Sequence, residues 1–235
     1  MNQNGANCRK AKGINMVYSK KCLKASKHKY HPKSKNELRV LLFDKNISLT
    51  QIDISAINDF SELFKGIDRE DYSGIEQWDV SHVLNMSGMF YDCQDFNVNI
   101  SNWDVSFVND MSYMFFGAVV FNQPLEKWNV SSVTDMSCMF FCATSFNKPL
   151  NNWNVSSVVN MCGMFAGLDN NRYGSMKFNQ PLDNWNVSSV VNMCGMFQDT
   201  KRFNQPLTSW NVKNVTNMRD MFLNSAQNPL PSWYR

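Results

Sequence analysis

The sequence has few of the residues and segments on which most enzymes, membrane proteins and secreted proteins depend. Its 235 residues include three histidines, and no Gly-x-Ser-x-Gly, phosphate loop, dinucleotide loop or metal-spaced His/Glu set occurs. We therefore expect neither an enzyme nor a cofactor. No run approaches the roughly 20 apolar residues of a membrane span, and the first 25 residues contain neither the apolar segment of a signal peptide nor a lipoprotein motif. These absences favour a cytoplasmic location.

The charge is divided unevenly along the chain. Residues 1–39 contain eleven Lys or Arg and one acid, whereas residues 40–235 contain twelve Lys or Arg and nineteen acids. A basic arm thus precedes an acidic body. Residues 9–35 could bind nucleic acid or an anionic membrane, or could simply be solvated or contact the acidic body.

A repeated unit fills most of the chain. The seven tryptophans are separated by steps of 25, 25, 25, 32, 25 and 23 residues, and a fixed period of this size indicates stacked repeats. Trp128 and Val130 are two apart, as on one face of a strand, whereas Val133, Met136 and Met139 follow at helical spacing. The pattern predicts an α/β repeat with one short parallel strand and one helix per roughly 25 residues. Ser132 and Asp135 resemble a capping box that would start this helix.

The same signals divide the chain into three segments. Residues 1–30 show no periodicity and are expected to form a flexible basic arm. Residues 31–51 are expected to form an N-terminal helical cap, with a helix from about 35 to 44 after the capping box Ser34-x-x-Glu37. Residues 52–235 then form a solenoid of about seven repeats.

The repeat also resembles a known family. Leu-x-x-Trp-x-Val-x-x-Val has the spacing of a leucine-rich repeat, and Met-x-x-Met-Phe-x-x-Ala-x-x-Phe-Asn-Gln-Pro-Leu is similar to the bacterial BspA-like leucine-rich-repeat family. The resemblance extends over roughly Tyr30 to Trp233. It implies a right-handed leucine-rich-repeat-like solenoid, often found in surface proteins, and it implies adhesion or partner binding only loosely.

The cysteines do not indicate disulfides or a metal site. There are seven, and five of them occupy repeat positions that hold other, mostly small, residues in other copies. Cys162 and Cys194 hold the same position in neighbouring repeats, but adjacent helices lie about 8–10 Å apart, too far for an unstrained disulfide. No common zinc finger has the spacing of Cys8, Cys22, His28 and His31. We expect free thiols and no bound metal.

Candidate contact residues are those that depart from the repeat, because the repeat itself solves a packing problem. The tryptophans are expected to form a structural core ladder of Trp78, Trp103, Trp128, Trp153, Trp185 and Trp210. The 32-residue step contains an insertion with Arg172 and Tyr173, residue types common at interfaces, although it could also be a tolerated surface loop. The remaining candidates for partner binding are Asp79, Asp104, His82 and Phe107. The polar rows could alternatively be structural hydrogen-bond ladders, and the aromatic residues could pack between repeats.

These observations favour a non-enzymatic binding or adhesion module that presents a surface to a protein or host-surface partner. The alternative is an intracellular scaffold tethered to nucleic acid or an anionic membrane through residues 9–35.

Overall fold

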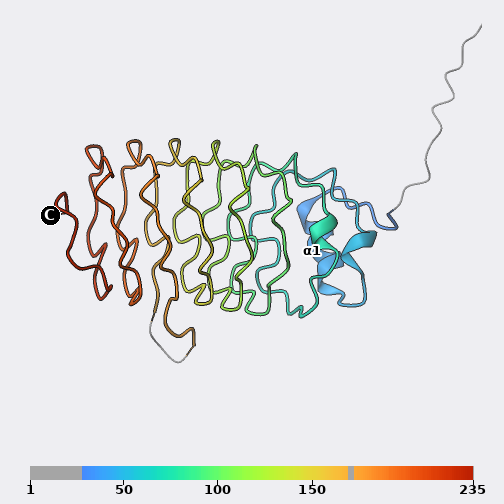
Figure 1. Cartoon of the computed structure of the whole chain (residues 1–235). Coiled ribbons are helices and arrows are strands. Elements are labelled where there is room, and N and C mark those ends of the chain that lie inside the picture. Colours follow the sequence, from blue (N-terminus) through green and yellow to red (C-terminus); the bar gives the residue numbers. More distant parts are fainter. Residues whose placement is uncertain (1–27, 169–171, 235) are drawn as a thin grey trace, which may run out of the picture.

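The computed structural model describes residues 28–168 and 172–234. The described chain forms a row of similar coils stacked along one axis, with a short helix at the N-terminal end (Figure 1). Its helices are α1 (Lys35–Phe43) and the 3-10 turns η1 (Leu49–Gln51) and η2 (Ile75–Gln77). Within the described residues there is no further helix and no extended strand or sheet.

Single parallel backbone bridges join each coil to the next. The bridging residues are Asp59, Asn85, Asp110, Asp135, Asn160, Asn192 and Asn217. We number the coils 1 to 7 by these residues. Trp233 then takes the tryptophan position of a following turn.

The predicted α/β leucine-rich-repeat-like solenoid is wrong, because the Met-x-x-Met-Phe segments are not helices. In coil 4, the N–H groups of Met136, Cys138 and Phe140 donate to carbonyls of coil 5 at 2.8–2.9 Å. The intervening N–H groups of Met139 and Phe141 donate to carbonyls three residues back. An α-helix would use all of these groups internally. Cys138 also has a φ of +52°, which a right-handed helix excludes.

The supposed helix start and strand are both tight turns. Asp135 accepts a hydrogen bond from the Ser137 N–H at 2.8 Å, and Ser132 donates to the Ser106 carbonyl of coil 3 at 2.7 Å. Asn129, next to the tryptophan, likewise accepts from the N–H two residues on, at 3.2 Å. Asn and Asp form such turns readily because their side chains reach that N–H group. Both turns recur in all seven coils, so they replace the expected strand and helix of each repeat.

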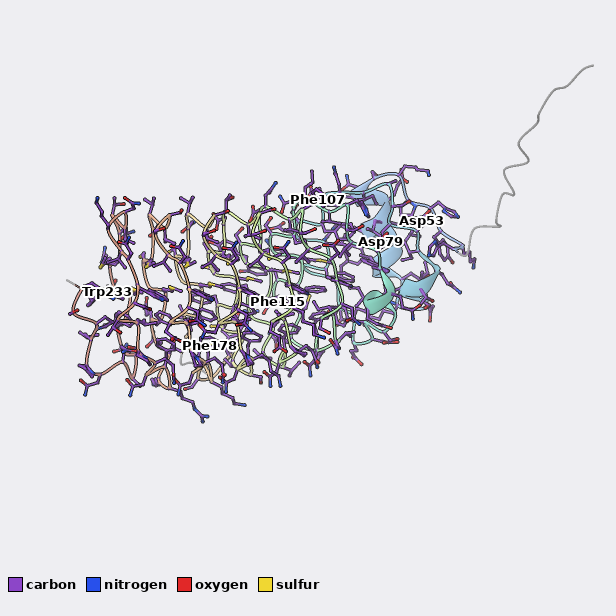
Figure 2. The ribbon with its side chains drawn as sticks, turned by 45° about the horizontal axis from the view of Figure 1, so that its top comes forward. Asp53, Asp79, Phe107, Phe115, Phe178 and Trp233 are labelled. Atoms are coloured by element: carbon purple, nitrogen blue, oxygen red, sulfur yellow. The ribbon has the colours of Figure 1, made fainter. Side chains whose placement is uncertain are left out.

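Stacked aromatic rings form the core. Phe140 lies 5.6 Å from Phe165 of coil 5, with ring planes 4° apart, and 4.1 Å from Phe146 of its own coil. The equivalent phenylalanines continue both columns along the stack, and Figure 2 shows Phe115 and Phe178 within it. This offset stacking adds to the burial of apolar area.

The expected tryptophan ladder is buried, and each indole also fixes the register between coils. The exposed fractions of the six side chains are between 3% and 6%. The Trp153 indole N–H donates to the Leu125 carbonyl at 2.9 Å, and every other tryptophan makes the same bond to a carbonyl of the preceding coil.

The Phe-Asn-Gln-Pro-Leu motif is explained by a ladder of carboxamides. Asn147 accepts from the Asn179 N–H at 2.9 Å and from the Gln180 side chain at 3.0 Å, both in the next unit. Asn122 and Asn179 repeat this contact with their own neighbours. The invariant Asn therefore supplies an acceptor that the irregular backbone of the return segment lacks.

Helix α1 closes the N-terminal end of the stack. It begins after Ser34, which accepts from the Glu37 N–H at 3.2 Å, and it buries Leu38 and Leu42. The Arg39 guanidinium donates to carbonyls of coil 1, including those of Leu63 and Lys65 at 2.7 and 2.9 Å. These donors satisfy carbonyls that would otherwise have no partner on that side.

No helix of the described part of the chain combines the length and the apolar character needed to cross a bilayer.

Candidate functional site at the N-terminal end of the stack

A row of carboxylates runs along one edge of coils 1 to 3. Asp53, Asp79 and Asp104 hold the turn position next to the tryptophan slot, and we call them the acidic row. Each carboxylate accepts from the N–H of the serine two residues on, at 3.0–3.1 Å. In coils 4 to 7 the same position is occupied by Asn129, Asn154, Asn186 and Asn211, which make the same hydrogen bond.

The turn itself therefore does not require a negative charge at this position, because Asn forms the same turn. Hydrogen bonds from Ser55, together with the nearby His31, lower the pKa of Asp53 to about 2. The serines of the same turns lower the pKa values of Asp79 and Asp104. All three groups are thus negatively charged at neutral pH, and the turn geometry strengthens their preference for the ionised form.

A groove lies between the first two carboxylates. It has a volume of about 520 Å³, and Trp78, Thr50 and Gln77 contribute to its lining together with Asp53 and Asp79. His28 and His82 also line it. Figure 2 shows Asp53, Asp79 and Phe107 along the same upper edge of the stack, near α1. This end therefore combines a concave surface with negative charge.

His82 and Phe107 hold one repeat position but behave differently. The His82 ring lies 3.0 Å from the Ile57 carbonyl and 3.3 Å from that of Ile54, so it links coil 2 to coil 1. Ser132 of coil 4 makes a similar link to a carbonyl of coil 3. Phe107 cannot form such a bond, and its side chain is 63% exposed. Of the two, Phe107 is the residue that is available to a partner.

Arg172 and Tyr173 do not line this groove. The Arg172 guanidinium forms an ion pair with Asp92 of coil 2, and the Tyr173 hydroxyl lies 3.4 Å from the same carboxylate. The Tyr173 ring packs edge-on against Phe116 at 6.3 Å. The insertion thus folds back over coils 2 and 3, and no pattern in the sequence predicts this contact between residues 80 positions apart.

Asp53 is a site residue that the sequence reasoning missed. Ile52-Asp53-Ile54-Ser55 matches Trp-Asp-Val-Ser of coil 2, so the alignment of the repeats contained the signal that Asp53 is equivalent to Asp79. Leu84, whose side chain is 42% exposed, is a second residue that the sequence analysis does not select as a contact candidate.

Of the basic segment 9–35, the structure describes residues 28–35. Lys35 is bound to Asp59 at 2.7 Å and to the Ser61 hydroxyl at 2.6 Å. Cys8 and Cys22 lie outside the described residues. In the described part of the chain, no group of three or more His, Cys, Asp or Glu side chains has an arrangement that could hold a metal ion.

The comparison with protein families identifies the chain. A family model described as "Mycoplasma protein of unknown function, DUF285" matches residues 58–174 and 170–234. These segments make up more than half of the chain, which therefore belongs to this family. No curated protein and no solved structure matches it. The description of the chain as a BspA-like leucine-rich-repeat solenoid is corrected by this match and by the described coils, which contain no extended strand and, apart from the short 3-10 turns η1 and η2, no helix.

Proposed function

We propose that this member of the DUF285 family is a non-enzymatic binding module that holds a protein partner at the N-terminal end of its coils. The contact surface consists of the acidic row, the groove beside it and the exposed Phe107. The partner presents arginine or lysine side chains to this surface.

The single observation that carries the proposal is the change from Asp to Asn between coils 3 and 4. Both residues make the same turn, as the hydrogen bonds of Asp104 and Asn129 show. A charge that recurs in three successive coils without a role in the turn is a feature of the surface. Close carboxylates also repel one another, and the charge of Asp79 accordingly opposes the lowering of the Asp104 pKa.

Phe107 fits the same kind of partner. In coil 4 the equivalent position holds Ser132, which forms a hydrogen bond to coil 3. Phe107 cannot form that hydrogen bond, and its large ring is exposed to water. An aromatic ring beside carboxylates offers an arginine both a stacking face and a counter-ion. Charge complementarity of this sort mainly sets specificity and the rate of association.

The experiment compares the binding of a hexa-arginine peptide by the full chain and by two variants with equal net charge. Asp79→Asn with Asp104→Asn keeps both turns, as the later coils demonstrate, but removes two charges from the acidic row. The matched control, Glu126→Gln with Asp183→Asn, removes two exposed charges from other parts of the stack. Fluorescence anisotropy gives the dissociation constant at two salt concentrations.

We expect the acidic-row variant to bind at least about tenfold more weakly, and the control to change affinity by less than about twofold. Phe107→Ser introduces the serine that coils 4 to 6 have at the same position. Made alone, this substitution should also weaken binding of the peptide, but it should leave the salt dependence of the dissociation constant unchanged. Equal weakening by both charge variants would show that net charge alone attracts the peptide. That result, or the absence of measurable binding by the unaltered chain, would refute the proposed surface.

A further inference from the structure

Two cysteines of neighbouring coils lie side by side on the surface of the stack. Cys162 of coil 5 and Cys194 of coil 6 hold the same position, and the bridge between Asn160 and Asn192 sets their register. The flanking ladder bond from the Gly163 N–H to the Cys194 carbonyl is 2.7 Å long. The expectation that helices keep these residues 8–10 Å apart is therefore wrong.

Their backbone geometry is compatible with a covalent bond. Hydrogen-bonded neighbouring chains are about 4.8 Å apart, which is within the range of about 4.4–6.8 Å for Cα atoms joined by a disulfide. The Cβ atoms of a disulfide lie about 3.5–4.5 Å apart, so the bond would draw the two side chains slightly closer together. The N–H groups of Cys162 and Cys194 each donate a 3.1 Å hydrogen bond to the side chain of the Asn two residues earlier, so both side chains leave the backbone in the same way. The Cys194 thiol is close enough to contribute to the raised pKa of Cys162, and both residues are half-buried rather than enclosed.

A third thiol lies nearby but is placed differently. Cys138 of coil 4 is one position further along its coil, and its sulfur lies 3.0 Å from where a Cβ on Gly163 would be. Tyr113, in coil 3, is close enough to this thiol to oppose the rise that burial causes in its pKa. Cys138 thus lies near a glycine and a tyrosine, whereas Cys162 and Cys194 hold the same position in neighbouring coils.

We propose that Cys162 and Cys194 form a cross-coil disulfide by exchange with a low-molecular-weight disulfide such as oxidised glutathione. One cysteine thiolate attacks a sulfur of the reagent, forms a mixed disulfide and displaces the first glutathione thiolate. The second cysteine thiolate then attacks the protein sulfur of that mixed disulfide and displaces the second. Two protein thiols are oxidised, one glutathione disulfide is reduced to two thiols, and these take up the two protons that the cysteines lost.

The bond would join coils 5 and 6 at the 32-residue step between tryptophans. The insertion lies between Cys162 and Cys194, so the disulfide would close the loop that contains it. Burial and the neighbouring thiols raise the pKa of Cys162 to about 11. Exchange should therefore be slow near neutral pH and accelerate as the pH rises, because the thiolate is the attacking species.

The test treats the full chain with oxidised glutathione at pH 8.5 and maps its tryptic peptides without reduction. Trypsin places Cys138, Cys142 and Cys162 in the peptide 128–172 and Cys194 alone in the peptide 178–201. We expect these two peptides to be joined in a protein that remains a monomer on a non-reducing gel. The joined species should disappear in Cys162→Ser and in Cys194→Ser, and should persist in Cys138→Ser and in Cys142→Ser.

Three results would overturn the proposal. The joined peptides could persist in Cys162→Ser, which would assign the bond to another cysteine. They could occur only in a dimer, which would make the bond intermolecular. Lastly, glutathione could remain attached to Cys162 and Cys194 without any joined peptide. A urea unfolding curve of each variant, compared with that of the unaltered chain, ensures that only folded proteins are compared.

Discussion

Replacing Trp153 by alanine tests whether the coils depend on their tryptophans as the structure indicates. The side chain lies between coils 4 and 5 and is 3% exposed. Its ring contacts Phe140, with centroids 6.5 Å apart, and its N–H donates to the Leu125 carbonyl. The substitution removes the ring, its contacts and the hydrogen bond together.

The expected loss of unfolding free energy is about 3–5 kcal/mol, the range for truncating a large buried aromatic side chain. The hydrogen bond contributes only the smaller part, about 0.5–1.5 kcal/mol. The Leu125 carbonyl still accepts from the Trp128 N–H at 3.0 Å, so the substitution leaves no buried acceptor unpaired. Trp153→Phe should for the same reason cost only about 1–2 kcal/mol, since a ring remains.

Urea unfolding followed by the fluorescence of the remaining tryptophans measures both changes. Trp233→Ala is the matched control, because Trp233 makes the same hydrogen bond, to Leu207 at 2.9 Å, but is only partly buried at the end of the stack. It should cost clearly less than Trp153→Ala. A cost below about 1 kcal/mol for Trp153→Ala, or equal costs at the two positions, would refute the assignment of the tryptophans to a continuous core.

Three further changes have defined outcomes. Gly117→Ala should lower the unfolding free energy by about 1–2 kcal/mol. The reason is that φ is +67° and that the new Cβ would lie 2.9 Å from the Asp92 carboxylate. Gly66→Ala is the control, because Gly66 has a similar φ but no atom within 4 Å of the new Cβ, and it should lower the unfolding free energy by less in the same urea titration. Asn147→Ala should cost about 1–3 kcal/mol, because it leaves a backbone N–H of the next unit without its acceptor, and exchange of that amide hydrogen should accelerate. The pKa of Asp53 is lowered from 3.8 to about 2, so its ionised form stabilises the fold fully above pH 4 and that contribution is lost as the pH falls toward 2. The difference in stability between the unaltered chain and Asp53→Asn should therefore shrink over this interval in acid titrations of unfolding.

The sequence was sufficient to predict the repeat and its core, but not the backbone of each coil. The 25-residue spacing of the tryptophans already required a periodic core, and the structure buries Trp153 accordingly. The three-residue spacing of Met136 and Met139 predicts a helix, but side-chain periodicity cannot distinguish a helix from successive turns. The positive φ of +52° at Cys138 is what distinguishes these turns from a helix, and a cysteine at this position does not predict such a φ.

The candidate site was predicted only in part, for reasons that concern distance along the chain. Asp79 and Asp104 could be selected as departures from the repeat, and the structure places them with Asp53 beside a groove. Arg172 was selected as part of an insertion, but its contact with Asp92 depends on the path of the loop. A loop that returns over earlier coils leaves no periodic trace in the sequence.

The order in which the coils are joined has a mechanical consequence. Each coil is held mainly by its two neighbours, and the end nearest α1 is clamped by Arg39, so a pulling force applied to the two ends should peel coils from the other end. A coil of 25 residues releases about 85 Å of extended chain, and the coil with the 32-residue step releases about 110 Å. In an optical trap, the chain should thus lengthen in steps of nearly equal size, and a single longer step should mark the coil that contains the insertion.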